Sequence, residues 1–295
     1  MTDRKLFQPE ALKRIHKLDL RARYVMEGLL SGMHKSPFFG QSMEFLQHRQ
    51  YTRGDDLRRI DWKVWGKQDK FYVKQYEEET NLRAVLMVDA SESMRYGGRP
   101  DAMTKYEYAA TLAVSLGYLL LQQQDAVGCV RFDDDLRQIV PATSGRGHLN
   151  TIVQSLETGE MREKTDLSTI LARTAELFPR RGMVILFSDL FIPRAGLWSG
   201  LKTLRSRGHD VIVFHVLDPD ERRFTFHGPT RFDGLEQSGF LRCNPRALRE
   251  GYLEFFEKYL DEIRSGCAAC RVDYNLADTG DPLDATLSRM LLKRQ

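Results

Sequence analysis

The chain has 295 residues, of which 42% are apolar and 29% are charged. Its 44 lysines and arginines nearly balance 41 aspartates and glutamates, for a formal net charge of +3. A chain of this length and apolar content can bury a substantial core, which excludes a mainly disordered protein. Because the balanced charge creates no global basic field, we expect no nucleic-acid partner.

The four cysteines are too few for a disulfide framework. Cys129 lies in an apolar run and is expected to be a buried thiol of the core. Cys267 and Cys270 form a single Cys-x-x-Cys, without the further Cys or His ligands that a structural zinc site requires. We therefore expect ordinary reduced thiols and leave the role of this pair open.

No segment approaches the roughly 20 consecutive apolar residues that span a bilayer. The N-terminus runs directly into charged sequence, without the apolar stretch of a secretory signal. We therefore expect a cytoplasmic protein with no membrane span.

Residues 1–80 are expected to form an N-terminal extension of helix and β structure. An amphipathic helix is predicted from Pro9 to Leu30, because apolar residues recur at steps of three or four: Leu12, Ile15, Leu18, Ala22, Met26 and Leu29. This helix either packs on its own domain or contacts a membrane surface or a partner. Packing on its own domain is favoured, because the charged face of such a helix is usually exposed to solvent. The content of Gly, Ser and Pro in residues 31–50 indicates a loop, and residues 71–79 favour a strand.

Residues 81–295 alternate between short apolar runs and segments of helical period. Strands are predicted at Ala84–Val88, Ala126–Phe132, Gln138–Val140, Met183–Phe187, Val211–Val216 and Val272–Leu276, with a hairpin tip at Asp133–Asp135. Helices are predicted near 104–123, 147–157, 167–178, 196–207 and 246–265 and at the C-terminus, with a β-rich insertion near 222–242. This alternation is typical of an α/β fold with a doubly wound, mostly parallel sheet flanked by helices.

Oxygen-bearing side chains follow two of these strands and open one helix. Asp89, Ser91 and Ser93 form an Asp-x-Ser-x-Ser pattern after the first strand, Thr165 precedes a helix, and Asp189 follows a later strand. Because the carboxyl ends of parallel strands meet at one edge, we expect these groups to lie together. Two carboxylates and three hydroxyls suit a hard cation, Mg²⁺ or alternatively Mn²⁺ or Ca²⁺. In another interpretation, the aspartate and serines only cap a helix.

This set resembles the metal-ion-dependent adhesion site, or MIDAS, of von Willebrand factor type A domains. The resemblance implies a von Willebrand factor A-like, Rossmann-like fold in which Ser91, Ser93 and Thr165 contact the metal. It also implies that Asp89 and Asp189 act through water, and that an acidic side chain of a protein partner completes the shell. The sequence departs from the usual pattern just before Thr165, where Glu-Lys replaces small residues.

A second resemblance is carried by the block Tyr51–Gly66, which contains Gly-Asp-x-x-Arg-x-Ile-Asp-Trp at Gly54, Asp55, Arg58, Ile60, Asp61 and Trp62. Together with the Asp89 motif, this block is similar to the bacterial family called domain of unknown function 58, from about Tyr51 through Asp189. That resemblance implies an adaptor that works with a MoxR-type AAA+ ATPase in assembly or remodelling of protein complexes. The block itself is expected to be a salt-bridged contact between extension and sheet, or alternatively a surface that contacts a partner.

Two functions from different classes follow from these residues. The first is a non-enzymatic, metal-dependent protein-binding module whose Mg²⁺ captures a partner's carboxylate. The alternative is a Mg²⁺-dependent phosphohydrolase that uses Asp89 as phosphoryl acceptor. Such enzymes generally place a second aspartate two residues further on, where this chain has Ser91, and no phosphate-binding Gly-rich loop is present. The binding module is therefore favoured, and His215, inside a predicted strand, is expected to be a core residue.

Overall fold

The computed structural model describes residues 8–33, 48–50, 72–74, 82–145, 147–158, 167–233 and 239–294. The chain divides into one unit of Met1–Leu30 with Leu82–Gln295 and a second of Ser31–Asn81. The predicted domain division after residue 80 stays a prediction, and the observed first unit differs from it by including the first 30 residues. The block Tyr51–Gly66 and Thr165 lie outside the described residues.

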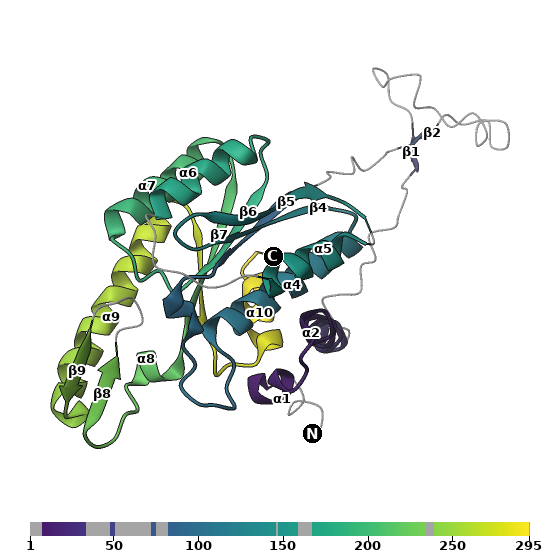
Figure 1. Cartoon of the computed structure of the whole chain (residues 1–295). Helices are drawn as coiled ribbons and strands as arrows, with labels where there is room; N and C mark the ends of the chain where they lie inside the picture. Colours follow the sequence, from purple (N-terminus) through teal and green to yellow (C-terminus); the bar gives the residue numbers. More distant parts are fainter. Residues whose placement is uncertain are drawn as a thin grey trace. The chain divides into compact units, whose positions relative to one another are not determined.

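A six-stranded sheet forms the centre of the first unit (Figure 1). Its strands are β3 (Arg83–Asp89), β4 (Ala126–Phe132), β5 (Leu136–Thr143), β6 (Met183–Ser188), β7 (Asp210–Leu217) and β10 (Asp273–Asp278). The order is β10-β7-β6-β3-β4-β5, and every neighbouring pair is parallel except β4 and β5. This topology confirms the predicted fold class. The strand order reverses between β3 and β6, where sheets of this kind bind ligands at the carboxyl ends of the strands.

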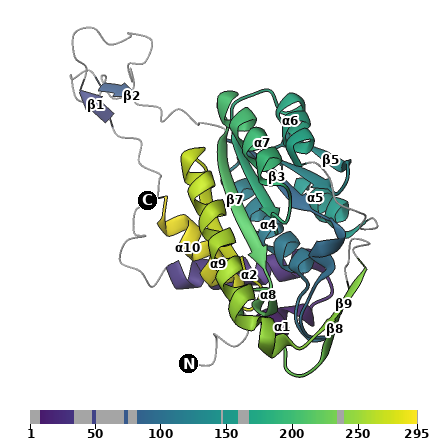
Figure 2. The same cartoon turned by 90° about the vertical axis from the view of Figure 1, so that its left-hand side faces the viewer.

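Helices cover both faces of the sheet, as Figure 1 shows. On one face lie α4 (Lys105–Gln122), α5 (His148–Glu157) and α10 (Leu283–Leu292). On the other face lie α6 (Leu167–Leu177), α7 (Arg194–Ser206) and α9 (Pro245–Ala269). Two short helices, η3 (Glu92–Arg95) and α8 (Pro219–Arg223), follow β3 and β7. In Figure 2 the carboxyl end of β7 runs down toward α8.

The packing of these layers explains why the strands read as continuous apolar runs. All seven residues of β4 are buried, as are six of the seven in β3, because helices cover both faces. Leu186 and Val213 of the sheet pack in one cluster with Leu171, Leu201 and Ile263 of the helices, all fully buried. Each such side chain contributes roughly 1.5–3 kcal/mol through burial, which makes the sheet a rigid platform for the loops at its edge.

The predicted N-terminal helix is two helices, α1 (Pro9–Lys13) and α2 (Leu18–Met33). The break between them lets both Leu12 and Leu18 be buried, whereas Ile15 stays partly exposed. The sequence pattern missed it because the apolar spacing continues on both sides of the interruption. Lys13 donates to the backbone oxygens of Pro100 and Ala102, so α1 contacts the α/β unit.

The remaining elements agree with the predicted order but differ in length. The edge strand β5 has eight residues rather than three, and α9 extends four residues beyond the predicted end at 265. The insertion contains an antiparallel pair, β8 (Thr230–Asp233) and β9 (Phe240–Cys243). The second unit contains the antiparallel pair β1 (His48–Gln50) and β2 (Tyr72–Lys74), so the last three residues of the segment expected to be a loop form a strand. No helix in the described ranges is both long and apolar enough to cross a membrane.

The four cysteines are free thiols that differ in burial. Cys129 and Cys267 are fully buried free thiols, and burial raises the pKa of each to about 12. Cys270 is also a buried free thiol, whereas Cys243 is partly exposed. The predicted burial of Cys129 is therefore confirmed.

Candidate metal centre

Asp89 and the residue pair Ser188-Asp189 meet where the strand order reverses. Strands β3 and β6 are parallel neighbours, with Val88 opposite Phe187, so their last residues lie side by side. The Ser188 hydroxyl donates to Asp89 Oδ2 at 2.6 Å, and the Ser91 backbone N–H donates to Asp89 Oδ1 at 2.9 Å. The Asp89 carboxylate is thus held in one orientation by both neighbouring loops.

The two serine hydroxyls of the Asp-x-Ser-x-Ser motif lie together. Ser91 Oγ and Ser93 Oγ are 3.1 Å apart, at the start of the short helix η3. Adjacent ligands of an octahedral Mg²⁺ at about 2.1 Å from the ion lie about 3 Å from each other. The separation of the two hydroxyls therefore fits two neighbouring positions of one coordination shell.

The electrostatics of the site favour a cation. Burial and, after it, the negative charge of Asp189 together raise the pKa of Asp89 to about 6, although hydrogen bonds from Ser188 and Ser91 act to lower it. Because the Asp189 carboxylate disfavours ionisation of the buried Asp89, a positive charge beside the two side chains would be favourable. In donor chemistry, the residues at this edge fit a hard divalent ion.

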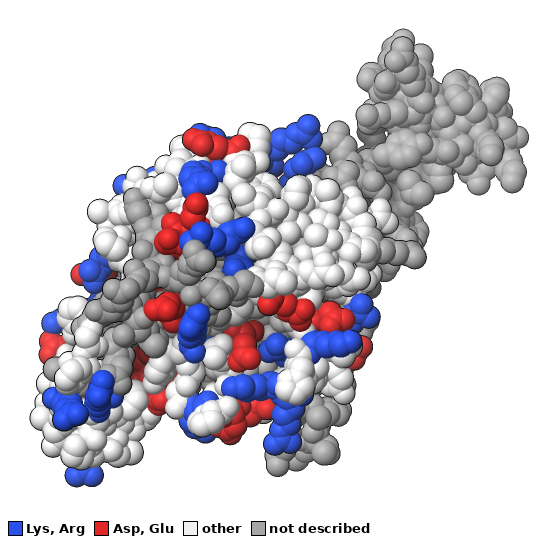
Figure 3. Space-filling view, viewed as in Figure 1, with Lys and Arg blue, Asp and Glu red and all other residues white. Residues whose placement is uncertain are grey.

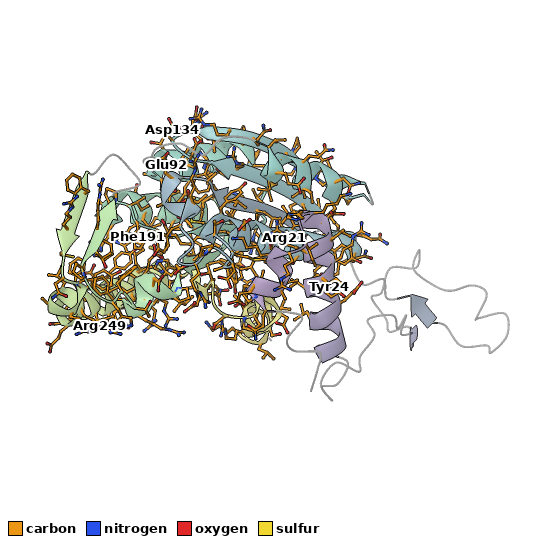
Figure 4. The ribbon with its side chains drawn as sticks, turned by 60° about the horizontal axis from the view of Figure 1, so that its bottom comes forward. Arg21, Tyr24, Glu92, Asp134, Phe191 and Arg249 are labelled. Carbon is orange, nitrogen blue, oxygen red and sulfur yellow. The ribbon has the colours of Figure 1, made fainter. Side chains whose placement is uncertain are left out.

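One positive charge is already present, on Lys105 at the start of α4. Lys105 Nζ donates to Asp189 Oδ2 at 2.8 Å and to Glu221 Oε1 at 2.7 Å. Burial alone would lower the pKa of Lys105, but the two carboxylates outweigh it and the pKa is raised. Nζ also lies 4.9 Å from the centre of the Phe191 ring, which is labelled in Figure 4.

The backbone after β6 is fixed in an uncommon conformation. Leu190, which is fully buried, has a φ of 55°, in the left-handed region that non-glycine residues seldom adopt. The Tyr259 hydroxyl donates to the Leu190 carbonyl at 2.9 Å, and the Phe191 N–H donates to Asp189 Oδ1 at 3.2 Å. These bonds hold the turn that presents the Asp189 side chain.

His215 supports the same turn from β7. Its Nε2 lies 2.9 Å from the Asp189 carbonyl oxygen, which accepts, and its Nδ1 lies 2.9 Å from the Tyr274 hydroxyl, which donates. Burial lowers the pKa of His215 to about 4, so the ring is neutral at pH 7. The expectation that His215 is a core residue is confirmed.

The structure brings Asp89, Ser91, Ser93 and Asp189 to one edge of the sheet, and the metal-binding role of these residues and of Thr165 stays a prediction. In the described ranges, no group of three or more His, Cys, Asp or Glu side chains could hold a metal. Of the four predicted metal ligands that the structure describes, two are carboxylates (Asp89 and Asp189) and two are hydroxyls (Ser91 and Ser93), so this site has only two side chains of those four types.

Sequence reasoning missed the residues that hold this edge together, namely Lys105, Tyr259 and Glu221. A lysine in the first turn of a helix ordinarily indicates a solvated side chain, so no local pattern announces its burial. Asp133–Asp135 joins β4 to β5, which confirms the predicted hairpin tip.

The fold and this edge define an α/β domain with an oxygen-rich site at the point where the strand order reverses. The sequence matches the family described as "Protein of unknown function DUF58" over residues 47–258. The chain belongs to this family, as its Gly-Asp-x-x-Arg-x-Ile-Asp-Trp block and Asp89 motif led us to expect.

Relatives of the chain include uncharacterised proteins of Mycobacterium bovis and Mycobacterium tuberculosis. They are 27% identical to it over 214 residues, which is 72% of this chain and 66% of the relatives' own length. The match therefore spans slightly less than two thirds of those proteins.

Several solved structures are similar over about the same part of the chain. A conserved hypothetical protein BatB from Bacteroides thetaiotaomicron has a TM-score of 0.47 and 19% identity, over 72% of this chain and 98% of its own. An aerotolerance-related membrane protein from Bacteroides fragilis has a TM-score of 0.48 and 18% identity, over 72% and 100%. The VWA domain of SpRpn10 has a TM-score of 0.41 and 12% identity, over 71% and 95%.

Proposed function

We propose that this chain is a non-enzymatic protein-binding module that works through a MIDAS-type metal site. Ser91, Ser93 and Thr165 would contact a Mg²⁺, with Asp89 and Asp189 acting through water. Neutral hydroxyl ligands leave the ion with excess positive charge, so it attracts a carboxylate from outside. A glutamate or aspartate of a protein partner would complete the coordination shell.

The observation that carries this proposal is the meeting of both carboxylates and both described hydroxyls at the edge where the strand order reverses. Asp89 is oriented by Ser188 and Ser91, and the Ser91 and Ser93 hydroxyls are 3.1 Å apart. A helix cap alone would not account for this arrangement, because the Ser91 side chain makes no capping hydrogen bond to η3.

We further propose that the partner is a MoxR-type AAA+ ATPase or one of its client proteins. The support is the resemblance to the family, together with membership of it. On the face seen in Figure 3, acidic and basic side chains lie interspersed rather than segregated. A single coordinated carboxylate, together with mixed surface charge, suits a specific and reversible protein contact.

No observation favours the phosphohydrolase. Its general acid would be expected two residues after Asp89, where Ser91 instead directs its hydroxyl to Ser93. The only ammonium bonded to the candidate site in the described residues is that of Lys105, which is shared by two carboxylates.

The test is a binding assay in which the chain is immobilised and a MoxR-type ATPase is the probe, with Mg²⁺ or with a chelator. We expect retention with Mg²⁺ and its loss with chelator or with the double substitution Ser91→Ala and Ser93→Ala. Ser206→Ala is the matched control, because Ser206 is an exposed serine of α7 whose hydroxyl donates to the Thr203 carbonyl of the same helix.

Retention that is indifferent to chelator and to the serine substitutions would overturn metal-dependent binding. Hydrolysis of a phosphate ester with Mg²⁺, abolished by Asp89→Asn, would instead establish the enzyme.

A further inference from the structure

The side chain of Lys105 is among the largest fully buried in the described structure, although lysine is rarely buried. Its ammonium group bonds to one carboxylate from the end of β6, Asp189, and to one from α8, Glu221. The face of the Phe191 ring covers a further side at 4.9 Å. The ammonium is therefore enclosed by partners that prefer a positive charge.

Glu221 connects this ammonium to the loop that follows β7. While its Oε1 accepts from Lys105, its Oε2 accepts from the Asp218 backbone N–H at 2.8 Å. This second bond belongs to the capping box that begins α8. A single lysine thus links α4, the end of β6 and the start of α8.

We propose that Lys105 is a tethered cation that shares Asp189 with the metal and lowers the affinity of the site for a divalent ion. This inference rests on the proposed function, because it concerns the same site. Lys105 is a positioning residue, since it acts on the metal through Asp189 and through its own charge.

Two consequences of the ion pair support this role. First, Asp189 is neutralised without a metal, so the folded chain does not need a divalent ion to keep this carboxylate buried. Second, an ion that approaches Asp189 meets the repulsion of an ammonium already 2.8 Å from the same carboxylate. In a buried site this repulsion is only weakly screened by solvent or salt.

The ion pair also sets the net charge of the site, and this charge matches that of one divalent ion. With Lys105 in place, the charges of Asp89, Asp189 and Glu221 sum with the ammonium to −2, which one divalent ion neutralises. Without the ammonium the same three carboxylates carry −3. The tethered cation therefore favours release of the metal, and of any carboxylate bound to it, over permanent occupancy.

The test is titration of the purified chain with MgCl₂ by calorimetry at low salt, comparing the wild type with Lys105→Met. We expect Lys105→Met to bind Mg²⁺ at least about tenfold more tightly, because a nearby positive charge is removed. The matched control is Lys258→Met, which removes the same charge from an exposed lysine of α9. It should leave the affinity unchanged.

A second variant moves the affinity in the opposite direction. Glu221→Gln removes one negative charge and leaves Asp189 as the only carboxylate on the ammonium, so Mg²⁺ binding should weaken by at least about threefold. Lys105 keeps a partner in this variant, which protects the fold. If Lys105→Met unfolds in chelator, its affinity for Mg²⁺ is instead taken from the Mg²⁺ concentration at which half of the protein refolds.

The outcomes separate this inference from the proposed function. Equal Mg²⁺ affinity in the wild type and Lys105→Met, or weaker binding in Lys105→Met, overturns the tethered cation and leaves the metal site standing. Binding by Lys105→Met alone, with none by the wild type, supports the tethered cation and overturns metal-dependent function in the native chain. Binding by neither overturns both.

Discussion

Lys105 and Asp189, which are 84 positions apart in the chain, form an ion pair of 2.8 Å in which neither side chain is more than 2% exposed. The pair joins the first residue of α4 to the end of β6, across the point where the strand order reverses. A buried pair of this kind is costly to break, because each partner alone would be a charge without solvent.

Removal of one member of this pair should therefore destabilise the fold. Asp189→Asn leaves Lys105 with only Glu221, and we expect the free energy of unfolding to fall by about 3 kcal/mol. Urea denaturation in the presence of chelator measures the change without any contribution from metal. Glu254→Gln, which breaks the exposed pair with Lys258, should leave the midpoint unchanged. Equal midpoints for Asp189→Asn and the wild type would contradict the structure.

The raised pKa of Asp89 predicts how stability depends on pH without metal. The folded chain holds this proton up to about pH 6, whereas the unfolded chain releases it near 3.8. The folded state therefore binds more protons between these values, and the contribution of Asp89 to stability is lost as the pH rises through about 6. The size of this contribution is on the order of 3 kcal/mol.

The measurement compares the wild type with Asp89→Asn in chelator. The wild type should gain stability relative to the variant as the pH falls from 7 to 4. Mg²⁺ should reduce the gain, since a bound cation favours the ionised carboxylate. If the difference in stability between the two proteins does not change with pH, Asp89 has an ordinary pKa, and its burial beside Asp189 does not raise it.

Tyr259 should act as a positioning residue for the turn after β6. Tyr259→Phe removes the hydrogen bond to the Leu190 carbonyl and leaves a buried acceptor with less than its full set of bonds. We expect a loss of about 1 kcal/mol in unfolding free energy and weaker Mg²⁺ binding through Asp189. As a control, Tyr274→Phe should cost similar stability through His215 with a smaller effect on Mg²⁺. Equal effects of both variants on Mg²⁺ would show that the Leu190 turn has no special part.

The burial of three thiols predicts a simple labelling pattern. At pH 8, iodoacetamide should modify Cys243 in the native chain and leave Cys129, Cys267 and Cys270 unmodified. In urea all four should react, which mass spectrometry of the intact chain will show. Rapid labelling of Cys267 under native conditions would contradict its buried place on α9.

Much of the fold could be predicted because a strand that is buried on both faces has an uninterrupted run of apolar residues. The segments Ala84–Val88 and Met183–Phe187 are uninterrupted apolar runs, and both are central strands of the observed sheet. The break between α1 and α2 left no such mark, since Leu12 and Leu18 continue one spacing across it. Edge strand β5 was underestimated because its residues outside the predicted strand are partly or fully exposed and include Pro141, which is uncommon within strands.

The site could be predicted only in part for a different reason. Asp89, Ser91 and Ser93 form a local motif, and Asp189 follows a strand, so strand order was enough to bring them together. Lys105 depends on contacts between residues far apart in sequence, and its position at the start of a helix suggests solvent exposure. The burial of this ammonium can be recognised only from the folded structure, in which Asp189 after β6 and Glu221 of α8 lie beside it.

The central claim is a divalent ion held between the Ser91 and Ser93 hydroxyls at the edge where β3 and β6 meet. Crystals of the chain grown with MnCl₂ test it directly, because anomalous scattering locates manganese independently of the refined atoms. We expect an anomalous peak about 2.2 Å from both hydroxyl oxygens. The absence of a peak there, in crystals that show the ion bound elsewhere and Lys105 still paired with Asp189, would contradict it.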